Sequence, residues 1–349
     1  MKKIILLFGF LSALLTYLNA QDYVLTVPVG WGTGVTGGGT NTPVIVNTES
    51  ALRNALKSNS VIIIDGTVAL DSTIYPTDIN NLTVLGRNGA VLNSVEGVFV
   101  FRNSSNVIVR NMKFVGPGSA TDQRPDLLCL ENTTLVWIDH CEFVDGADGN
   151  FDIRSSSNYI AVTWCKFSYT DKSGIHAFSN LIGSSDRETS DRGTLKVTFQ
   201  YCWWAEGVQE RMPRVRFGQV HVVNNLYTSA VSNYCIRGGF EADLYIDKNA
   251  FVGVKSPVTH NENQNFNCTF TSDNLLSNVS ETNTKEKIDA LAGRQGEATW
   301  NPYTTSSYLI RAIPASDVQR TVSHAACGAG ATLLVAADGT VSSTCTNVR

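Results

Sequence analysis

The octapeptides VIVRNMKF (Val107–Phe114), VWIDHCEF (Val136–Phe143) and IAVTWCKF (Ile160–Phe167) share a pattern that returns in VTFQYCWW, VHVVNNLY and LYIDKNAF. The six units begin at residues 107, 136, 160, 197, 220 and 244. Positions one and three are hydrophobic, position six is Met, Cys or Asn, and position eight is aromatic. An internal repeat of this length is typical of a solenoid, in which each unit packs on its neighbours.

The spacing within each unit indicates strands rather than helices. Residues two apart share a face of a strand, so positions one and three face one way and positions six and eight form a second pair. The change of parity indicates a corner where one strand gives way to the next. We therefore predict an all-β fold, a right-handed parallel β-helix with long external loops. A β-sandwich is the alternative, but its strands would not keep this register.

Stacking of equivalent positions gives internal ladders. Three thiols at position six, Cys141, Cys165 and Cys202, are expected to lie buried in the interior, neither catalytic nor disulfide-bonded. Cys327 and Cys345 lie in the tail of the chain and are the best candidates for one disulfide. No Cys/His spacing typical of zinc is present.

The segments around the repeat have simpler roles. Residues Asn47–Lys57 have an apolar stripe and a capping residue, Asn47 or Thr48, and predict a helix that covers the open end of the solenoid. Val61–Ile64 and Leu82–Leu85 predict strands. The period fades after Asn274, and we expect the chain from Leu291 onward to wrap back along the outside.

The N-terminus predicts export. Residues 1–20 combine two lysines, an apolar run and a small-residue cleavage site, as in a signal peptide. The apolar run is too short for a membrane anchor. We expect residues 21–349 to form a single domain, a monomer that is secreted into the periplasm or outside the cell.

Net charge restricts the ligands of this domain. The formal charge is −4, and removal of Lys2 and Lys3 makes it −6. A negative protein is a poor general binder of nucleic acid, so we expect no nucleic-acid partner. An acidic ligand would need a local basic cluster, a metal, or both.

One basic cluster is present in QERMPRVRFG (Gln209–Gly218). It contains Arg211, Arg214 and Arg216, and arginine presents a rigid fork of donors that fits carboxylates. Three such residues at short spacing predict an anion site. A solvated basic patch or an ion-pair network is the simpler interpretation of the cluster taken alone.

Acidic residues recur at similar offsets before the repeat units. Asp126 lies 10 residues before Val136 and Asp152 lies 8 before Ile160, so we expect them on adjacent coils of one face. Asp148 is four residues before Asp152, and Gly149 can bend the chain to bring them together. Three carboxylates without His or Cys favour Ca²⁺. The alternative is that the aspartates cap turns separately.

These motifs carry a family resemblance. VWIDHCEF, DGNFDI, YTDKSG, LIGSSD and RMPRVRFGQVHVVNN followed by YCIRGG resemble the extracellular pectate lyases, over about Gly30 to Cys345. The resemblance implies a parallel β-helix that cleaves polygalacturonate by β-elimination, with Ca²⁺ bridging protein and substrate carboxylates.

The resemblance also implies residue roles. Asp126, Asp148 and Asp152 match the calcium ligands, and Arg211 matches the arginine that abstracts the C5 proton. Lys172 and Arg216 match residues that bind and polarise the substrate carboxylate, and Arg214 matches a further subsite contact. Arginine ordinarily stays protonated, so the alternative is that Arg211 stabilises the enolate while water carries the proton.

Three departures from the family pattern stand out. Arg124 replaces a second acid two residues before Asp126, which would weaken calcium binding before substrate arrives. An insertion, Gly174–Asn180, separates Lys172 from LIGSSD. Gln200-Tyr201-Cys202 replaces a His-His-Asn run, with little expected effect. Asp139-His140 matches the family but falls inside the repeat, so we interpret it as a structural pair.

Two other functions are compatible with parts of this pattern. A pectin lyase acts on methyl-esterified chains without calcium, and the three aspartates argue against it. A non-catalytic β-helix that binds polysaccharide or acts as an adhesin could retain the ladders. It would have no need of Lys172, Arg211 and Arg216 together.

Overall fold

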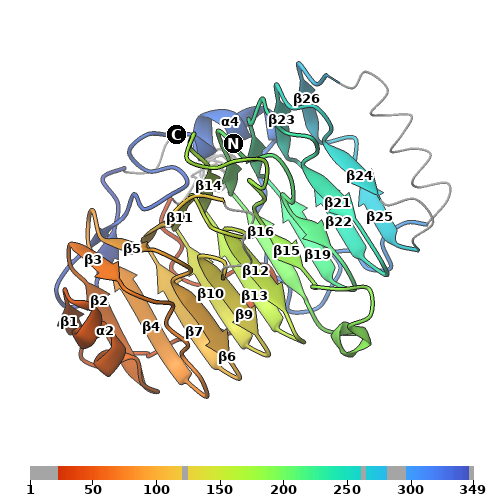
Figure 1. Cartoon of the computed structure of the whole chain (residues 1–349). Coiled ribbons are helices and arrows are strands. Elements are labelled where there is room, and N and C mark those ends of the chain that lie inside the picture. Colours follow the sequence, from red (N-terminus) through yellow and green to blue (C-terminus); the bar gives the residue numbers. More distant parts are fainter. Residues whose placement is uncertain (1–22, 120–124, 261–264, 281–295, 346–349) are drawn as a thin grey trace, which may run out of the picture.

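The computed structural model describes residues 23–119, 125–260, 265–280 and 296–345; the predicted signal peptide and Arg124 lie outside these ranges. Within them, three parallel sheets wind along one axis, as in a parallel β-helix (Figure 1). No helix in these ranges is long and apolar enough to cross a membrane.

The first sheet contains the N-terminal half of each repeat unit. Its order follows the chain, because every coil contributes one strand. Its strands are β1 (Val44–Val46), β2 (Ser60–Ile64), β4 (Asn80–Gly86), β7 (Ser105–Arg110), β10 (Thr134–Asp139), β13 (Asn158–Thr163), β16 (Val197–Gln200), β19 (Gln219–Val223), β22 (Asp243–Asp247) and β25 (Asn267–Phe270).

The second sheet contains the C-terminal half of each unit. Its strands are β3 (Thr67–Leu70), β5 (Val91–Ser94), β8 (Lys113–Val115), β11 (Glu142–Val144), β14 (Lys166–Ser168), β17 (Trp203–Trp204), β20 (Leu226–Tyr227), β23 (Ala250–Val252) and β26 (Leu275–Ser277).

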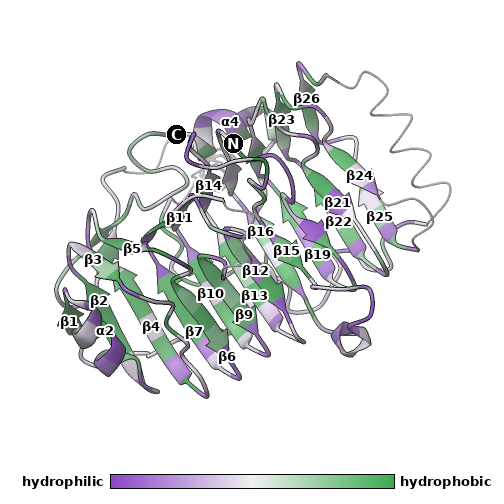
Figure 2. Ribbon diagram, viewed as in Figure 1, coloured by the Kyte–Doolittle hydropathy of each residue, from purple (hydrophilic) through white to green (hydrophobic). Residues whose placement is uncertain are grey.

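The third sheet lies between the repeat units in sequence and includes residues of the predicted site. Its strands are β6 (Phe99–Arg102), β9 (Leu128–Glu131), β12 (Phe151–Arg154), β15 (Leu181–Ile182), β18 (Arg214–Val215), β21 (Ile236–Gly238) and β24 (Val258–His260). Figure 2 shows the strands largely hydrophobic, with hydrophilic residues towards their ends and in the loops.

The predicted register is confirmed. Position one of each unit pairs with position one of the next, from Val107 through Val136 and Ile160 to Leu244. The corner lies at position five, where every unit has a left-handed backbone, with φ between 48° at His140 and 59° at Asn111. This conformation turns the chain between the first two sheets and explains the change of parity.

The ladders fill the interior as predicted. The thiols of Cys141, Cys165 and Cys202 are free and fully buried. The aromatic residues of position eight stack, with ring centroids 4.8 Å apart for Phe114 and Phe143 and 4.4 Å apart for Tyr227 and Phe251. These contacts hold consecutive coils in register.

The asparagine ladder continues one coil beyond the six units. Asn225 Nδ2 donates to Asn249 Oδ1 at 3.1 Å, and Asn249 Nδ2 donates to Asn274 Oδ1 at 3.0 Å. Buried amides are thereby paired with one another instead of being left unsatisfied.

The flanking segments also follow the prediction. Helix α2 (Glu49–Ala55) is capped by the Thr48 side chain, buries Leu52 and lies at the N-terminal end of the solenoid (Figure 1). The C-terminal segment wraps along the outside, where Leu333 exchanges two hydrogen bonds with the Asn111 amide. This segment contains α4 (Ala315–Val322) and the hairpin of β27 (Leu334–Val335) and β28 (Val341–Ser342); two 3₁₀ turns, η1 (Gly30–Gly32) and η2 (Thr189–Asp191), complete the elements.

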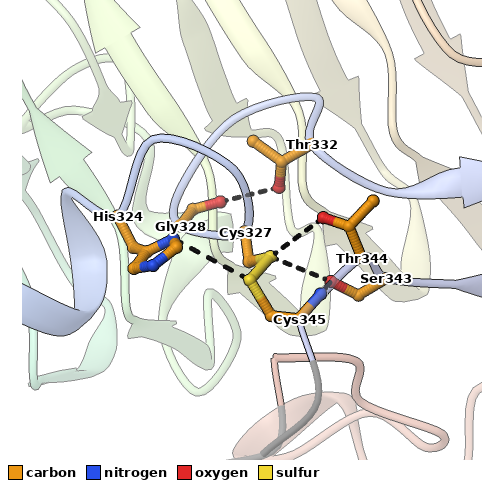
Figure 3. The surroundings of a disulfide bond; sticks show 7 residues. All are labelled: His324, Cys327, Gly328, Thr332, Ser343, Thr344 and Cys345. Atoms are coloured by element: carbon orange, nitrogen blue, oxygen red, sulfur yellow. Dashed lines mark hydrogen bonds between the residues drawn. A yellow bond between two sulfur atoms is a disulfide. The ribbon is translucent and has the colours of Figure 1, made fainter. Parts of the chain in front are cut away.

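Cys327 and Cys345 form a disulfide within this segment, as expected from their place in the tail (Figure 3). The Ser343 hydroxyl donates to Cys327 Sγ at 3.2 Å. The bond joins the end of the described chain to the loop that follows α4.

Candidate active site

The three aspartates come together at the start of β9 and β12. β12 pairs with β9 so that Asp152 lies opposite Cys129. Leu127 N–H donates to Gly149 O at 3.2 Å, which places Gly149, not Asp152, beside Asp126. We expected the two acids on adjacent coils of one face. They lie on adjacent coils and are offset along the strands, with Gly149 beside Asp126.

Gly149 has no side chain where these carboxylates converge. A Cβ at Gly149 would lie 2.6 Å from Asp126 Oδ1 and 3.4 Å from Asp152 Oδ1. Both oxygens therefore face the same small space. Asp148 precedes this glycine directly in the chain, and its charge acts on both Asp126 and Asp152.

Burial and repulsion act on these carboxylates. Burial, followed by the charges of Asp152 and Asp148, raises the pKa of Asp126 well above its ordinary value. Burial also raises the pKa of Asp152 to about 6, although Arg211 and the Leu181 N–H oppose the shift. Within the described ranges, Asp126 Oδ1 is buried without a hydrogen-bond partner. A hard cation at this place would satisfy that oxygen and relieve the repulsion, so the residues fit Ca²⁺.

The arginines lie two coils beyond Asp152 along the same sheet. Sheet order runs from β12 through β15 to β18, which begins at Arg214, and Arg211 lies just before it. Arg211 has a left-handed backbone, with φ of 60°, ahead of a cis Met212–Pro213 peptide. Its positive charge opposes the rise in the pKa of Asp126 and of Asp152, so Arg211 interacts electrostatically with both carboxylates.

Several buried guanidinium nitrogens in the arginine cluster have no hydrogen-bond acceptor among the described residues. The Nε atoms of Arg211, Arg214 and Arg237 are buried and have no hydrogen-bond partner in the part of the chain that is described. Arg214 lies directly opposite Arg237 in the sheet. Burial, together with the charges of Arg216, Arg211 and Arg237, lowers the pKa of Arg214. Concentrated positive charge with unused donors is suited to bind an anion.

Arg216 is held differently from its neighbours. Its Nε lies 2.6 Å from Asp186 Oδ1, and its Nη1 donates to Gly183 O at 3.0 Å. Asp186 belongs to the LIGSSD motif, so this motif fixes the position of Arg216. The charge of Arg216 still acts on Arg214, which keeps it part of the cluster.

Lys172 is the most exposed of the predicted site residues. It is on an exposed turn after β14, and Asp145 anchors that turn through Thr170 and Ser173. Among the described residues, its ammonium has no ion pair with the acids of the site. Phe178, from the insertion, forms backbone bridges to Gly149 on one coil and to Glu210 on the next.

The structural interpretation of Asp139 and His140 agrees with their surroundings. Both side chains are fully buried, and His140 Nδ1 lies 2.9 Å from Asp139 Oδ2. Arg110 Nε donates to the same oxygen at 2.6 Å. The pair belongs to a hydrogen-bonded network at the ends of first-sheet strands, in which the Thr163 hydroxyl also donates to Asp139 Oδ1 at 2.6 Å.

Sequence reasoning missed several residues of this region. His176 and Phe178 lie in the insertion, Asp186 lies in a motif without an assigned role, and Arg237 stands alone in YCIRGG. The register could have found Arg237, because β21 pairs with β18. No pattern in the sequence gives the direction of the inserted loop.

A separate cavity of about 440 Å³ lies near the starts of β16, β19 and β22. Three of its charged groups have polar partners: Arg192 pairs with Glu241 at 2.7 Å, and Asp243 accepts from the Thr299 N–H at 3.0 Å. The fourth, Lys196, lies over the Trp31 ring, with its Nζ 5.1 Å from the centroid. These groups have no evident need of a ligand, so the acids and arginines remain the candidate active site.

The comparisons with known proteins agree with this fold. Residues 29–330 match the family model described as pectate lyase. The chain belongs to the pectate lyase family. The match covers most of the solenoid and includes every predicted site residue.

Curated relatives of this family member include a pectate trisaccharide-lyase of Thermotoga maritima, 37% identical over 204 residues. That match covers 56% of this chain and 53% of the relative, so the chain spans about half the length of that relative. Pectate lyase D of Dickeya chrysanthemi is 30% identical over 282 residues, 68% of each chain.

A solved structure of a pectate lyase bound to a hexasaccharide has the same fold. It is 22% identical, with a TM-score of 0.69, and the match covers 90% of this chain and 99% of that one. At this identity the likeness supports the parallel β-helix alone.

Proposed function

We propose that this protein is a secreted, calcium-dependent pectate lyase that cleaves polygalacturonate by β-elimination. The observation that carries the proposal is the cluster of buried, partner-poor arginines beside three crowded carboxylates. A polymer of uronates supplies the anions that the arginines lack, and pectate lyases are generally calcium-dependent.

Asp126, Asp148 and Asp152 are the proposed calcium ligands. When bound, Ca²⁺ would neutralise the uronate carboxylate and make the C5 proton more acidic. Arg214 and Arg216 would bind carboxylates along the substrate, with Arg216 fixed by Asp186. Lys172 would contact a substrate carboxylate from its exposed turn.

In the reaction, the C5 proton leaves, the C4–O4 bond breaks and a C4=C5 double bond forms, while the departing oxygen takes a proton from water. Arg211 is the proposed central residue. Arg211 would either receive the C5 proton as the neutral guanidine, or, as the guanidinium, hold the developing enolate charge while water receives the proton.

The proposal extends to the whole chain. Residues 1–20 would be a signal peptide that is removed during export, and residues 21–349 would act as one domain and as a monomer. The protein would work in the periplasm or outside the cell.

The test uses two substrates, polygalacturonate and highly methyl-esterified pectin, each with calcium and with EDTA. The expected result is unsaturated product, read by ultraviolet absorbance, from polygalacturonate with calcium only. Each lost charge-assisted contact should cost about 1.5–3 kcal/mol, so the esterified polymer should be a poor substrate. Preference for esterified pectin in EDTA would indicate a pectin lyase. Binding without any product would indicate a non-catalytic protein.

A further inference from the structure

The insertion places two rings between the calcium ligands and Arg211. His176 Nε2 lies 2.9 Å from Asp148 Oδ1. The centroids of the His176 and Phe178 rings are 4.1 Å apart. The Arg211 guanidinium lies over the other ring of this pair, 4.8 Å from the Phe178 centroid. A continuous line of contacts thus joins Asp148 to Arg211.

The hydrogen bond of His176 restricts a partly exposed carboxylate. The Asp148 side chain is 41% exposed, in contrast to Asp126 and Asp152, which are almost fully buried. Burial fixes the latter two, whereas Asp148 needs a partner to hold one orientation. With Oδ1 engaged by His176, Oδ2 is left for a cation.

Phe178 gives the imidazole a rigid support. Its backbone bridges Gly149 on one coil and Glu210 on the other, so it forms part of the row that extends the third sheet. Phe178 O also accepts a hydrogen bond from the Tyr169 hydroxyl at 2.5 Å. A ring packed on such an element loses less entropy when it holds a ligand side chain than a ring on a free loop would.

We propose that His176 is a positioning residue for the calcium ligand Asp148, supported by Phe178, and that the insertion thereby raises the affinity for calcium. Groups that hydrogen-bond to metal ligands orient them, and their loss typically weakens metal binding 10–100-fold. The inference rests on the proposed function, because it takes Asp148 as a calcium ligand.

The test is calcium binding to the substrate-free protein by isothermal titration calorimetry. His176→Ala removes the hydrogen bond, and His176→Gln keeps an N–H donor of similar reach. Ile175→Ala is the matched control, since Ile175 lies in the same insertion but is 84% exposed. Thermal unfolding in EDTA checks that each variant folds.

We expect about 10-fold weaker calcium binding for His176→Ala, at the lower end of that range because Asp148 is partly exposed. His176→Gln should recover most of the loss, and Ile175→Ala should match the wild type. An unchanged or tighter affinity in His176→Ala would overturn the inference, since a tighter one would mean that His176 competes with calcium. Equal losses in His176→Ala and His176→Gln would also contradict a role for the hydrogen bond.

Failure of this inference is separable from failure of the proposed function. Unsaturated product from the wild type, with unchanged calcium binding in His176→Ala, would remove the positioning role alone. Absence of product from the wild type would remove the lyase, and the calorimetric comparison would still report on His176 and Asp148. No calcium binding by the wild type would overturn the positioning role.

Discussion

Gly149 and Asp126 lie so close that a methyl group on Gly149 would sit 2.6 Å from Asp126 Oδ1. Real Cβ atoms essentially never come this near an oxygen, so the carboxylate would have to move. Asp126 is only 3% exposed, which leaves its side chain little room. The absence of a side chain at residue 149 is therefore a requirement of the proposed cation site.

Gly149→Ala should weaken calcium binding at least 10-fold, because it displaces one ligand. The overpacking should cost about 1–3 kcal/mol of folding stability. Calorimetry with calcium and thermal unfolding in EDTA measure the two effects. Gly174→Ala is the control, since its Cβ would meet only Ser119 O, at 3.9 Å. Wild-type affinity in Gly149→Ala would show that the cation does not use this space.

Arg211→Lys should lower kcat more than about a hundredfold, as for loss of a group that acts in the transition state. Lysine keeps the charge but not the planar fork, and its ammonium would not lie on the Phe178 ring in the same way. Steady-state kinetics on polygalacturonate measure the change, with circular dichroism as the check on folding. Near-normal turnover would exclude a central role for Arg211.

The interior thiols should resist alkylation in the native protein and react after unfolding. Burial raises the pKa of the Cys141 and Cys165 thiols, which disfavours the reactive thiolate. Mass spectrometry after a timed iodoacetamide pulse gives the extent of labelling. Rapid native labelling of Cys141, Cys165 or Cys202 would contradict the register. Each Cys→Ala change should cost about 1–3 kcal/mol.

His221 predicts a pH-dependent contribution to stability. It is buried between Tyr308 and Asp247, and burial lowers its pKa although Asp247 opposes the shift. The unfolded chain therefore takes up a proton near pH 6.5 that the native imidazole does not, so this contribution is complete above that pH and is lost as the pH falls.

Comparison with His221→Asn isolates this effect from the other titrating groups. The wild type should be more stable than the variant at pH 8, by about 1–3 kcal/mol for the lost buried hydrogen bonds. The difference should narrow as the pH falls from 7 to 5, measured by urea unfolding. A difference that widens towards acid pH would mean that the native imidazole is charged.

Much of the fold could be predicted from the sequence because a solenoid repeats its own constraints. Val107 and Val136 are equivalent in sequence, and they pair in the sheet. The same logic applies to Asp152 and Arg211, which lie 8 residues before Ile160 and 9 before Val220 and are two coils apart along the third sheet. The exact offset between Asp126 and Asp152 along the strands could not be predicted, because turns of unequal length follow the two acids before the next repeat unit.

The surroundings of Lys172 could not be predicted. The repeat predicts the position of a residue in its coil only when the number of residues to the next strand is known. The insertion after Lys172 changes that number, so the repeat does not place Lys172. In the structure, Phe178 forms the backbone bridges between Gly149 and Glu210, and Lys172 lies on an exposed turn. The contact of His176 with Asp148 depends on the path of that loop, which no repeat constrains.

The chemical identity of the product tests the central claim most directly. Polygalacturonate is incubated with the wild-type protein in calcium or in EDTA, and the oligosaccharides are analysed by mass spectrometry. Elimination gives a new chain end that is lighter by one water than the end that hydrolysis gives. We predict the lighter, unsaturated oligogalacturonates in calcium and intact polymer in EDTA. Saturated products, or equal cleavage in EDTA, would contradict calcium-dependent β-elimination at this site.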